Sequence, residues 1–382
     1  MQSNIDTVAI ISGSICHKPP LIGNWKCGAP WETIVSKVLG TLADLPQDYR
    51  DAMARTGVAP LWPQMRNVLP HHAPVPVTKS HLWAYADVRP LLLRAGELTP
   101  VEKAERRVLF LADPGRGQGA MQATSTIYVG LQLLLPGETA PAHKHTPSAA
   151  RIVVEGDGAY TIVDGDKLPM HAGDLILTPG GCWHDHGHGG TAPVIWLDAL
   201  DLPLFVYLEG SYAVEAPLQA HRNRPDPSEV EYRAAGLAPV RRRDRAAPAA
   251  YPMLRFPWAR TEAALRHVAA HNGGTSAELD YINPETGQSC LPTMGFTAML
   301  LRPGVAVRPP LRSASAVYHV VGGHGSTTIN GATHTWGPKD SFSAPVFAAI
   351  EHKAAGDAPA FVIRIHDTPL QEKLGYYEER ER

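Results

Sequence analysis

The sequence predicts a mainly β protein with two small β-barrels and a partly helical N-terminal extension. The 382 residues include 34 Gly and 35 Pro, and a chain so rich in turn residues favours many short strands over long helices. Short apolar runs separated by turn dipeptides follow one another at the spacing of a β-sandwich or barrel. The same pattern recurs after 167 residues, which indicates a second copy of the barrel.

The composition limits the classes of function. Hydrophobic residues make up 44% and charged residues 19% of the chain, as in soluble globular proteins. The net charge of −2 argues against binding to nucleic acid or to a membrane surface, because both need a basic excess. No apolar run is long enough to span a membrane or to serve as a signal peptide. The four cysteines are widely spaced and favour a reducing compartment, so we expect a soluble cytoplasmic protein.

Residues 1–110 are predicted to form the N-terminal extension, with short helices and an arm. Helical spacing of apolar residues occurs at 31–42, 48–56 and 88–95. The proline-rich segment 69–76 interrupts this pattern and must be a loop or an extended arm.

Residues 111–215 are predicted to form the first barrel, 216–252 a linker, and 253–382 the second barrel. The candidate strands of the first barrel are short apolar runs at 127–135, 151–154, 160–163, 175–178 and 194–200. The basic run at 241–245 lies in the linker, and we interpret it as a solvated segment rather than a nucleic-acid patch.

Three histidines of the first repeat form a candidate metal site. His143 and His145 lie two residues apart on a predicted strand, so their side chains project to the same face. His184 follows a Pro-x-Gly turn after a second strand and can point to the same place. Three imidazoles leave several coordination positions open and suit Fe, Zn, Cu or Ni. The alternative is that these histidines are exposed or hydrogen-bonded in the core.

The second repeat carries none of these ligands. Its matching positions are Pro310, Arg312 and Ile350, and none of them can replace an imidazole. We therefore predict one metal ion per chain and a metal-free C-terminal barrel with a packing or assembly role.

The spacing of glycines and histidines across residues 130–190 resembles the two motifs of the cupins, which are double-stranded β-helix (jelly-roll) barrels. Two positions depart from the cupin pattern, because Ala149 and Ala150 stand where many cupins have a glutamate, and His188 where an asparagine is frequent. Five longer motifs are AERRVL (104–109), TIYVGLQ (126–132), PAHKHT (141–146), CWHDHG (182–187) and YINPETG (281–287). With these motifs the chain resembles the gentisate and salicylate 1,2-dioxygenase family of bicupins over roughly residues 60–375.

This resemblance implies an Fe(II)-dependent enzyme of aromatic-acid catabolism. Its members insert both atoms of O₂ into gentisate or a 5-substituted salicylate, between the carbons that bear the carboxyl and hydroxyl groups. It implies an aromatic ortho-hydroxy acid and O₂ as substrates, and a homotetramer. Nothing in the sequence selects the ring substituent.

The resemblance also assigns roles to residues around the histidines. His186 is expected to contact substrate or to act in acid–base catalysis. His188 is expected to be exposed because it lies in a glycine-rich turn. Arg151 lies within an apolar strand and needs an anion, either an internal carboxylate or the substrate carboxylate. Arg107 matches a substrate-binding arginine, although the neighbouring Arg106 is the alternative. Gln132 and Asp198 match positions that support the substrate. We expect Asp198 either to orient a ligand histidine or to form a structural hydrogen bond within the barrel.

Three other functions are compatible with the same site. A non-catalytic metal-binding bicupin would keep the three histidines without turnover. A zinc-dependent cupin isomerase would also keep them, but neither function explains the adjacent arginine as well. A dioxygenase of the 1-hydroxy-2-naphthoate type is the alternative within ring cleavage.

Overall fold

The computed structural model describes residues 39–382, except 118, 217–224, 235 and 240–249. The chain divides into two compact units, Met1–His71 and His72–Arg382. Most of the predicted helix at 31–42 and all of the basic run at 241–245 lie outside the described residues. None of the described helices has the length and apolar character needed to cross a membrane.

The described part of the first unit is helical. It contains α1 (Gln47–Thr56) and α2 (Met65–Val68), with short 3₁₀ helices at Leu42–Asp44 and Trp62–Gln64. Helix α1 confirms the helix predicted at 48–56. It ends at Gly57, whose φ of 70° is the left-handed conformation that glycine adopts without strain.

The second unit begins with a segment that the sequence assigned to the extension. This segment contains β1 (His81–Trp83), α3 (Tyr85–Leu98), α4 (Val101–Ala104) and β2 (Val108–Phe110). Strand β1 joins a sheet of the C-terminal barrel, and β2 joins a sheet of the N-terminal barrel. Residues 72–110 therefore contribute a strand to each barrel rather than forming a separate arm.

The N-terminal barrel consists of two antiparallel sheets, with strand orders β12-β8-β5-β10-β3-β2 and β11-β4-β9-β6-β7. The short helices α5 (Leu202–Tyr207) and α6 (Pro227–Val230) follow the main strands. The strands are β3 (Tyr128–Leu134), β4 (Thr139–His145), β5 (Ala149–Glu155), β6 (Ala159–Val163), β7 (Asp166–Pro169), β8 (Leu175–Thr178), β9 (His184–His188), β10 (Val194–Leu200), β11 (Ala213–Glu215) and β12 (Arg255–Phe256).

The C-terminal barrel repeats this arrangement, with sheets β1-β20-β17-β22-β14-β13 and β15-β21-β18-β19 and a small ladder β16-β23. Two helices accompany it, α7 (Trp258–His271) and α8 (Thr368–Leu374). The strands are β13 (Ser276–Asp280), β14 (Gly295–Leu301), β15 (Ala306–Val307), β16 (Leu311–Arg312), β17 (Ala316–Gly322), β18 (Gly325–Ile329), β19 (Ala332–Trp336), β20 (Ser341–Ala344), β21 (Ile350–Ala354), β22 (Ala360–His366) and β23 (Glu379–Arg380).

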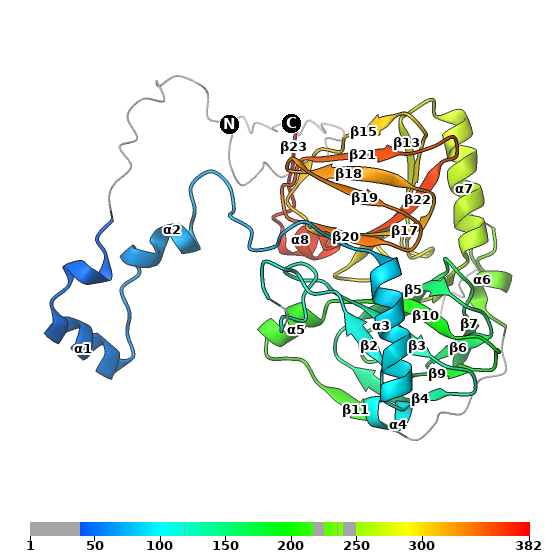
Figure 1. Cartoon of the computed structure of the whole chain (residues 1–382), viewed down its shortest axis with the longest axis horizontal. Helices are drawn as coiled ribbons and strands as arrows, with labels where there is room; N and C mark the ends of the chain where they lie inside the picture. Colours follow the sequence, from blue (N-terminus) through cyan, green and yellow to red (C-terminus); the bar gives the residue numbers. More distant parts are fainter. Residues whose placement is uncertain (1–38, 118, 217–224, 235, 240–249) are drawn as a thin grey trace, which may run out of the picture. The chain divides into compact units, whose positions relative to one another are not determined.

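The register of the strands confirms the internal repeat. Asp198 lies opposite Arg151 in the first barrel, and Arg364 lies opposite Tyr318 at the matching positions of the second. The two barrels pack against each other, and α3 runs along the N-terminal barrel beside β3 (Figure 1). One apolar core spans both barrels and includes Leu133, Trp196 and Ile363. Its burial removes a large apolar area from water, which is the main driving force for the fold.

A reciprocal polar contact joins the barrels. Asp201 accepts a hydrogen bond of 2.7 Å from the backbone N–H of Ser148 in its own barrel, and another from the Thr293 hydroxyl of the second half. The matching residues of the other barrel make the same contact in the opposite direction: Asp367, Ser315 and Thr126.

Candidate metal centre

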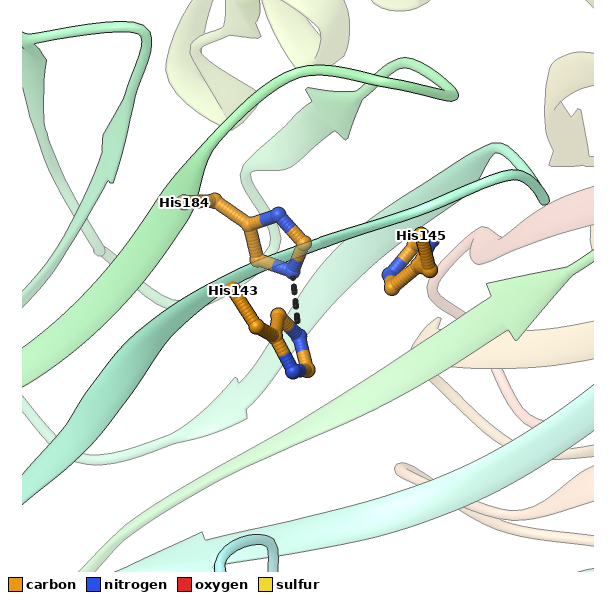
Figure 2. Close-up of side chains that lie close together, drawn as sticks. All are labelled: His143, His145 and His184. Atoms are coloured by element: carbon orange, nitrogen blue, oxygen red, sulfur yellow. Dashed lines mark hydrogen bonds between the residues drawn. The ribbon is translucent and has the colours of Figure 1, made fainter. Parts of the chain in front are cut away.

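His143, His145 and His184 converge inside the N-terminal barrel. His143 and His145 lie on β4, and His184 is the cross-strand partner of His143 on β9. Their potential ligand atoms all lie within 4.8 Å of one another, and Nε2 of His143 is 2.9 Å from Nε2 of His184 (Figure 2). Within the described part of the chain, this is the only cluster of three or more His, Cys, Asp or Glu side chains that meets such a distance. The structure thus brings together the three residues that the sequence selected.

Backbone carbonyls fix the orientation of two of these rings. Nδ1 of His145 is 2.7 Å from the carbonyl oxygen of Pro147, and Nδ1 of His184 is 3.1 Å from that of Cys182. Because a carbonyl only accepts, both Nδ1 atoms carry the proton and leave the Nε2 lone pairs free for a metal ion. Carbonyls therefore perform the orienting role that we expected of Asp198.

The environment keeps the three imidazoles neutral. Burial, together with the charges of Arg106 and Arg151, lowers the pKa of His143 to about 3. Burial lowers the pKa of His184 well below its usual value, and Arg151 adds to this effect. Neutral imidazoles are the form that binds a metal ion.

The spacing of one donor pair, His143 and His184, fits a divalent transition metal. Two imidazole nitrogens bound at right angles to one ion, at about 2.1 Å each, lie about 3 Å apart. The 2.9 Å between the Nε2 atoms of His143 and His184 agrees with this arrangement. Three nitrogen ligands leave further positions open, as reactive rather than structural metal sites require.

Arg151 and Asp198 form a buried pair beside the histidines. Arg151 is 3% exposed, and its Nε lies 3.1 Å from Oδ1 of Asp198. The guanidinium also donates to the Thr178 hydroxyl, and Asp198 accepts a 2.9 Å hydrogen bond from Nε1 of Trp196. Arg151 therefore has the internal carboxylate that was one of its two predicted partners, while its charge still acts on His184 and His186.

Burial dominates the electrostatics of this pair. It raises the pKa of Asp198, and the charge of Arg151 and the hydrogen bond from Trp196 only partly oppose it. Burial also lowers the pKa of Arg151, an effect that Asp198 opposes. Arg151 and Asp198 thus neutralise each other's charge. Binding of an anion in addition to Asp198 needs another cation at the site.

His186 lies beside the metal ligands with both ring nitrogens unsatisfied. It is 1% exposed and points to the same side of β9 as His184, with 5.9 Å between the two ring centroids. Neither Nδ1 nor Nε2 has a hydrogen-bond partner among the described residues. A buried imidazole without partners is costly, which is consistent with a ligand that completes its hydrogen bonds.

Gln132 occupies the same face of the barrel. It is buried on β3, two residues from Gly130, and Gly130 pairs with Asp198 on β10. Because alternate residues of a strand share a face, Gln132 and Asp198 project to the same side of the sheet.

Arg106, rather than Arg107, is the arginine whose charge reaches the histidines. Arg107 is buried in an ion pair with Glu138, and its Nη1 donates to the carbonyl of Gly96 at 3.2 Å. Arg106 donates to the Pro141 carbonyl at 2.6 Å, two residues before His143. Burial and the charge of Arg151 lower its pKa to about 10, so it stays protonated.

His188 differs from the expectation of an exposed residue. It is 4% exposed at the end of β9, and its Nε2 donates to the carbonyl of Ala192 at 2.6 Å. Its Nδ1 accepts from the backbone N–H of Gly190, so the glycine-rich turn folds back over the ring and buries it. His188 is a structural residue of this turn.

Known proteins share this fold and sequence. The Cupin domain family matches residues 130–200. The chain is 47% identical to gentisate 1,2-dioxygenase from Ralstonia sp., over 91% of this chain and 97% of that protein. It is 38% identical to 5-aminosalicylate 1,2-dioxygenase from Comamonas sp., over 86% and 88% of the two chains. The crystal structure of salicylate 1,2-dioxygenase adducts with gentisate, from Pseudoaminobacter salicylatoxidans, superposes with a TM-score of 0.81 at 30% identity, covering 90% of this chain and 98% of that one.

Proposed function

The chain belongs to the gentisate and salicylate 1,2-dioxygenase family of bicupins, and we propose that it uses Fe(II) to cleave the ring of gentisate or a 5-substituted salicylate. The observation that carries this proposal is the position of two arginines, Arg106 and Arg151, beside three neutral imidazoles. The histidines can hold a divalent metal, and the cationic surroundings favour a substrate that brings a carboxylate.

His143, His145 and His184 would hold the iron through their Nε2 atoms. Bound Fe(II) would supply open positions for the carboxylate and the ortho hydroxyl of the substrate, and a path for electrons from the ring to O₂. Both oxygen atoms enter the ring-opened product, so the reaction consumes no external reductant. Imidazole ligands are also compatible with zinc, and the choice of iron follows from the redox chemistry that ring cleavage requires.

Arg106 and Arg151 would bind the substrate carboxylate. Arg151 is already paired with Asp198, so this pair presents directed N–H groups with little net charge. Arg106 adds a cation that no described carboxylate neutralises through an ion pair, since it donates to the backbone carbonyls of Glu105 and Pro141. Together they offer the charge and the planar donors that a carboxylate binds.

His186 would accept a hydrogen bond from the phenolic hydroxyl of the substrate. Burial and the charges of Arg151 and Arg106 lower its pKa well below the usual value, so the ring is neutral and has a lone pair to accept with. Gln132 would orient the bound ring from strand β3. Its side chain projects to the same face of the barrel as Asp198, and its amide can both donate and accept hydrogen bonds.

Oxygen consumption provides the test. The metal-free protein is reconstituted anaerobically with Fe(II), and oxygen uptake is recorded with gentisate, salicylate, 5-amino-, 5-halo- and 5-nitrosalicylate, and 1-hydroxy-2-naphthoate. We expect uptake of one O₂ per substrate and a product heavier by two oxygen atoms in mass spectrometry. Full iron loading without oxygen uptake on any of these acids would favour a non-catalytic metal-binding bicupin.

We also propose a homotetramer in the cytoplasm. The balanced charge and widely spaced cysteines support the location, and a second barrel that lacks the metal ligands is available for subunit contacts. Light scattering at micromolar concentration tests the assembly, and a monomer would contradict it.

A further inference from the structure

The C-terminal barrel contains a cavity at the position that matches the metal centre. Two adjoining spaces, of about 20 Å³ and 310 Å³, are both lined by Arg312, Arg364, His366 and Thr368. Arg312 stands at the position of His145, and Pro310 and Ile350, which replace His143 and His184, line the smaller space. The second barrel therefore lacks the three metal ligands but has a space at the matching position.

Arg364 is a buried guanidinium with an unsatisfied donor. It stands at the position of Asp198 and is 9% exposed. Its Nη2 donates to the Thr297 hydroxyl at 3.0 Å, but its Nε has no hydrogen-bond partner. None of the described carboxylates forms an ion pair with it, so, unlike Arg151, this arginine has no internal anion.

Thr297 determines the tautomer of His366. The Thr297 hydroxyl gives its single proton to Oδ1 of Asp280 at 2.6 Å. It must therefore accept from Arg364 and from Nε2 of His366, which is 3.2 Å away. Nε2 of His366 thus carries the proton, and Nδ1 is a lone pair without a partner.

The imidazole of His366 is held in this position and stays neutral. A side chain at Gly295 would collide with the ring, so the glycine allows His366 to lie against the backbone of β14. Burial lowers the pKa of His366 well below its usual value, and the charges of Arg364 and Arg312 add to this effect. At neutral pH, two buried residues that line the same cavity, Arg364 and His366, therefore carry an unpartnered donor and an unpartnered acceptor.

The carboxylates that line the larger space limit the charge of an occupant. Glu379 pairs with Arg312 at 3.0 Å and accepts a 2.6 Å hydrogen bond from the Tyr377 hydroxyl. The larger space is also lined by Glu278, Asp280 and Glu372. These carboxylates would repel a multiply charged anion such as phosphate, whereas a singly charged ligand can place its charge on Arg364.

We propose that the C-terminal barrel binds a small organic monocarboxylic acid that carries a hydroxyl group, with its carboxylate on Nε of Arg364 and its hydroxyl donating to Nδ1 of His366. A carboxylate matches the guanidinium donors, and the hydroxyl matches an acceptor that no protein group satisfies. A space of about 310 Å³ is large enough for a molecule of the size of a hydroxybenzoate. This site is separate from the metal centre and does not depend on turnover there.

Calorimetry on a chain with a disabled metal centre tests the site. The full-length His143→Ala/His145→Ala variant is titrated with salicylate and with benzoate, which lacks the hydroxyl. We expect one equivalent of salicylate to bind per chain, more tightly than benzoate. Adding Arg364→Gln should weaken salicylate binding about 10- to 100-fold, as expected for loss of a charge-assisted hydrogen bond. Arg308→Gln is the matched control, because this arginine is exposed, pairs with Glu351 and lines neither space.

A second variant tests the hydroxyl contact. His366→Leu introduces the residue found at the matching position, Leu200, and should remove the preference for salicylate over benzoate while benzoate binding persists. Thermal melting of each variant without ligand confirms that it is folded. Absence of binding in the parent variant, equal weakening by Arg308→Gln, or unchanged binding in Arg364→Gln would overturn the proposal. Oxygen uptake by the iron-loaded native chain is measured separately, so failure here leaves the proposed catalytic function unaffected.

Discussion

Asp198 and Arg151 face each other across the paired strands β10 and β5, with Oδ1 of the aspartate 3.1 Å from Nε of the arginine. This pair connects the stability of the barrel to the chemistry of the site. The aspartate compensates a buried cation, and the same cation lies close enough to lower the pKa of the histidines around it. A change at either residue should therefore affect both unfolding and turnover.

Arg151→Ala should abolish ring cleavage and leave the metal bound, because a guanidinium is not a metal ligand. It should also lower the free energy of unfolding by about 3–5 kcal/mol, since Asp198 would remain buried without its partner. Arg151→Lys should be largely inactive as well, because a point charge does not reproduce the planar donors. Metal content, thermal melting and single-turnover oxygen uptake are measured on the same sample.

The double variant Arg151→Gln/Asp198→Asn separates the two effects. It removes both charges, so we expect it to regain much of the stability lost in Arg151→Ala without regaining activity. Near-normal turnover per folded metal site in any Arg151 variant would remove this residue from the substrate-binding site.

Metal content should be one equivalent per chain. A cluster of three possible metal ligands occurs once among the described residues. The matching positions in the C-terminal barrel are Pro310, Arg312 and Ile350. The His143→Ala/His145→Ala variant should lose the metal, because one remaining imidazole binds a divalent ion weakly. Elemental analysis after dialysis measures this. Two equivalents in the native chain, or retention of metal in the double variant, would contradict the prediction.

The adjacent arginines should respond differently to alanine. Arg106→Ala should reduce turnover at least tenfold and change stability little, because Arg106 donates its hydrogen bonds to exposed backbone carbonyls. Arg107→Ala should instead lower the free energy of unfolding by about 3 kcal/mol, because it leaves Glu138 without its buried partner. Urea unfolding and oxygen uptake are compared for the two variants. A stability loss in Arg106→Ala as large as that in Arg107→Ala would reverse the assignment.

The stability of the C-terminal barrel should fall in acid. Burial lowers the pKa of His319 to about 3 in the folded protein, whereas it is about 6.5 in an unfolded chain. Between these values the unfolded state binds a proton that the folded state does not, so unfolding becomes more favourable as the pH falls below about 6.5. Above that pH the residue makes no pH-dependent contribution. The expected slope from this residue is at most about 1.4 kcal/mol per pH unit.

His319→Gln isolates this effect. The variant keeps a group that can bond to the Ser341 hydroxyl, which is 3.0 Å from Nδ1 of His319, but it cannot titrate. Urea unfolding of both proteins from about pH 7.5 to about pH 5.5 should show a shallower acid dependence in the variant. Equal slopes would show that His319 does not contribute.

The ligands and both barrels were predictable because local rules determine them. Alternation along a strand places His143 and His145 on one face, and repeated turn dipeptides mark the two barrels. Such rules could not predict which of the two adjacent arginines, Arg106 or Arg107, points toward the site. Glu105 has a φ of 53°, and the alternation of a strand cannot be extrapolated through a residue in that conformation to Arg106 and Arg107.

Contacts between distant segments could not be predicted from the sequence either. The pairing of β1 with β20 and of β12 with β8 joins segments that are far apart in the chain, and no short-range pattern encodes such partners. The orientation of the ligand histidines depends on carbonyls of Pro147 and Cys182, and every residue carries a carbonyl. The conformation of the backbone, rather than residue identity, selects these two.

The reciprocal contact of Asp201 and Asp367 has an evolutionary consequence. Each aspartate accepts a hydrogen bond from a threonine of the opposite half. The two hydrogen bonds are therefore equivalent under the pseudo-two-fold symmetry that relates the halves. Self-complementary contacts of this kind are characteristic of two-fold dimers of identical subunits. A duplicated and fused gene for a one-barrel dimer would inherit this contact already formed. Selection could then retain the paired aspartates while one copy lost its imidazoles and diverged toward a different ligand.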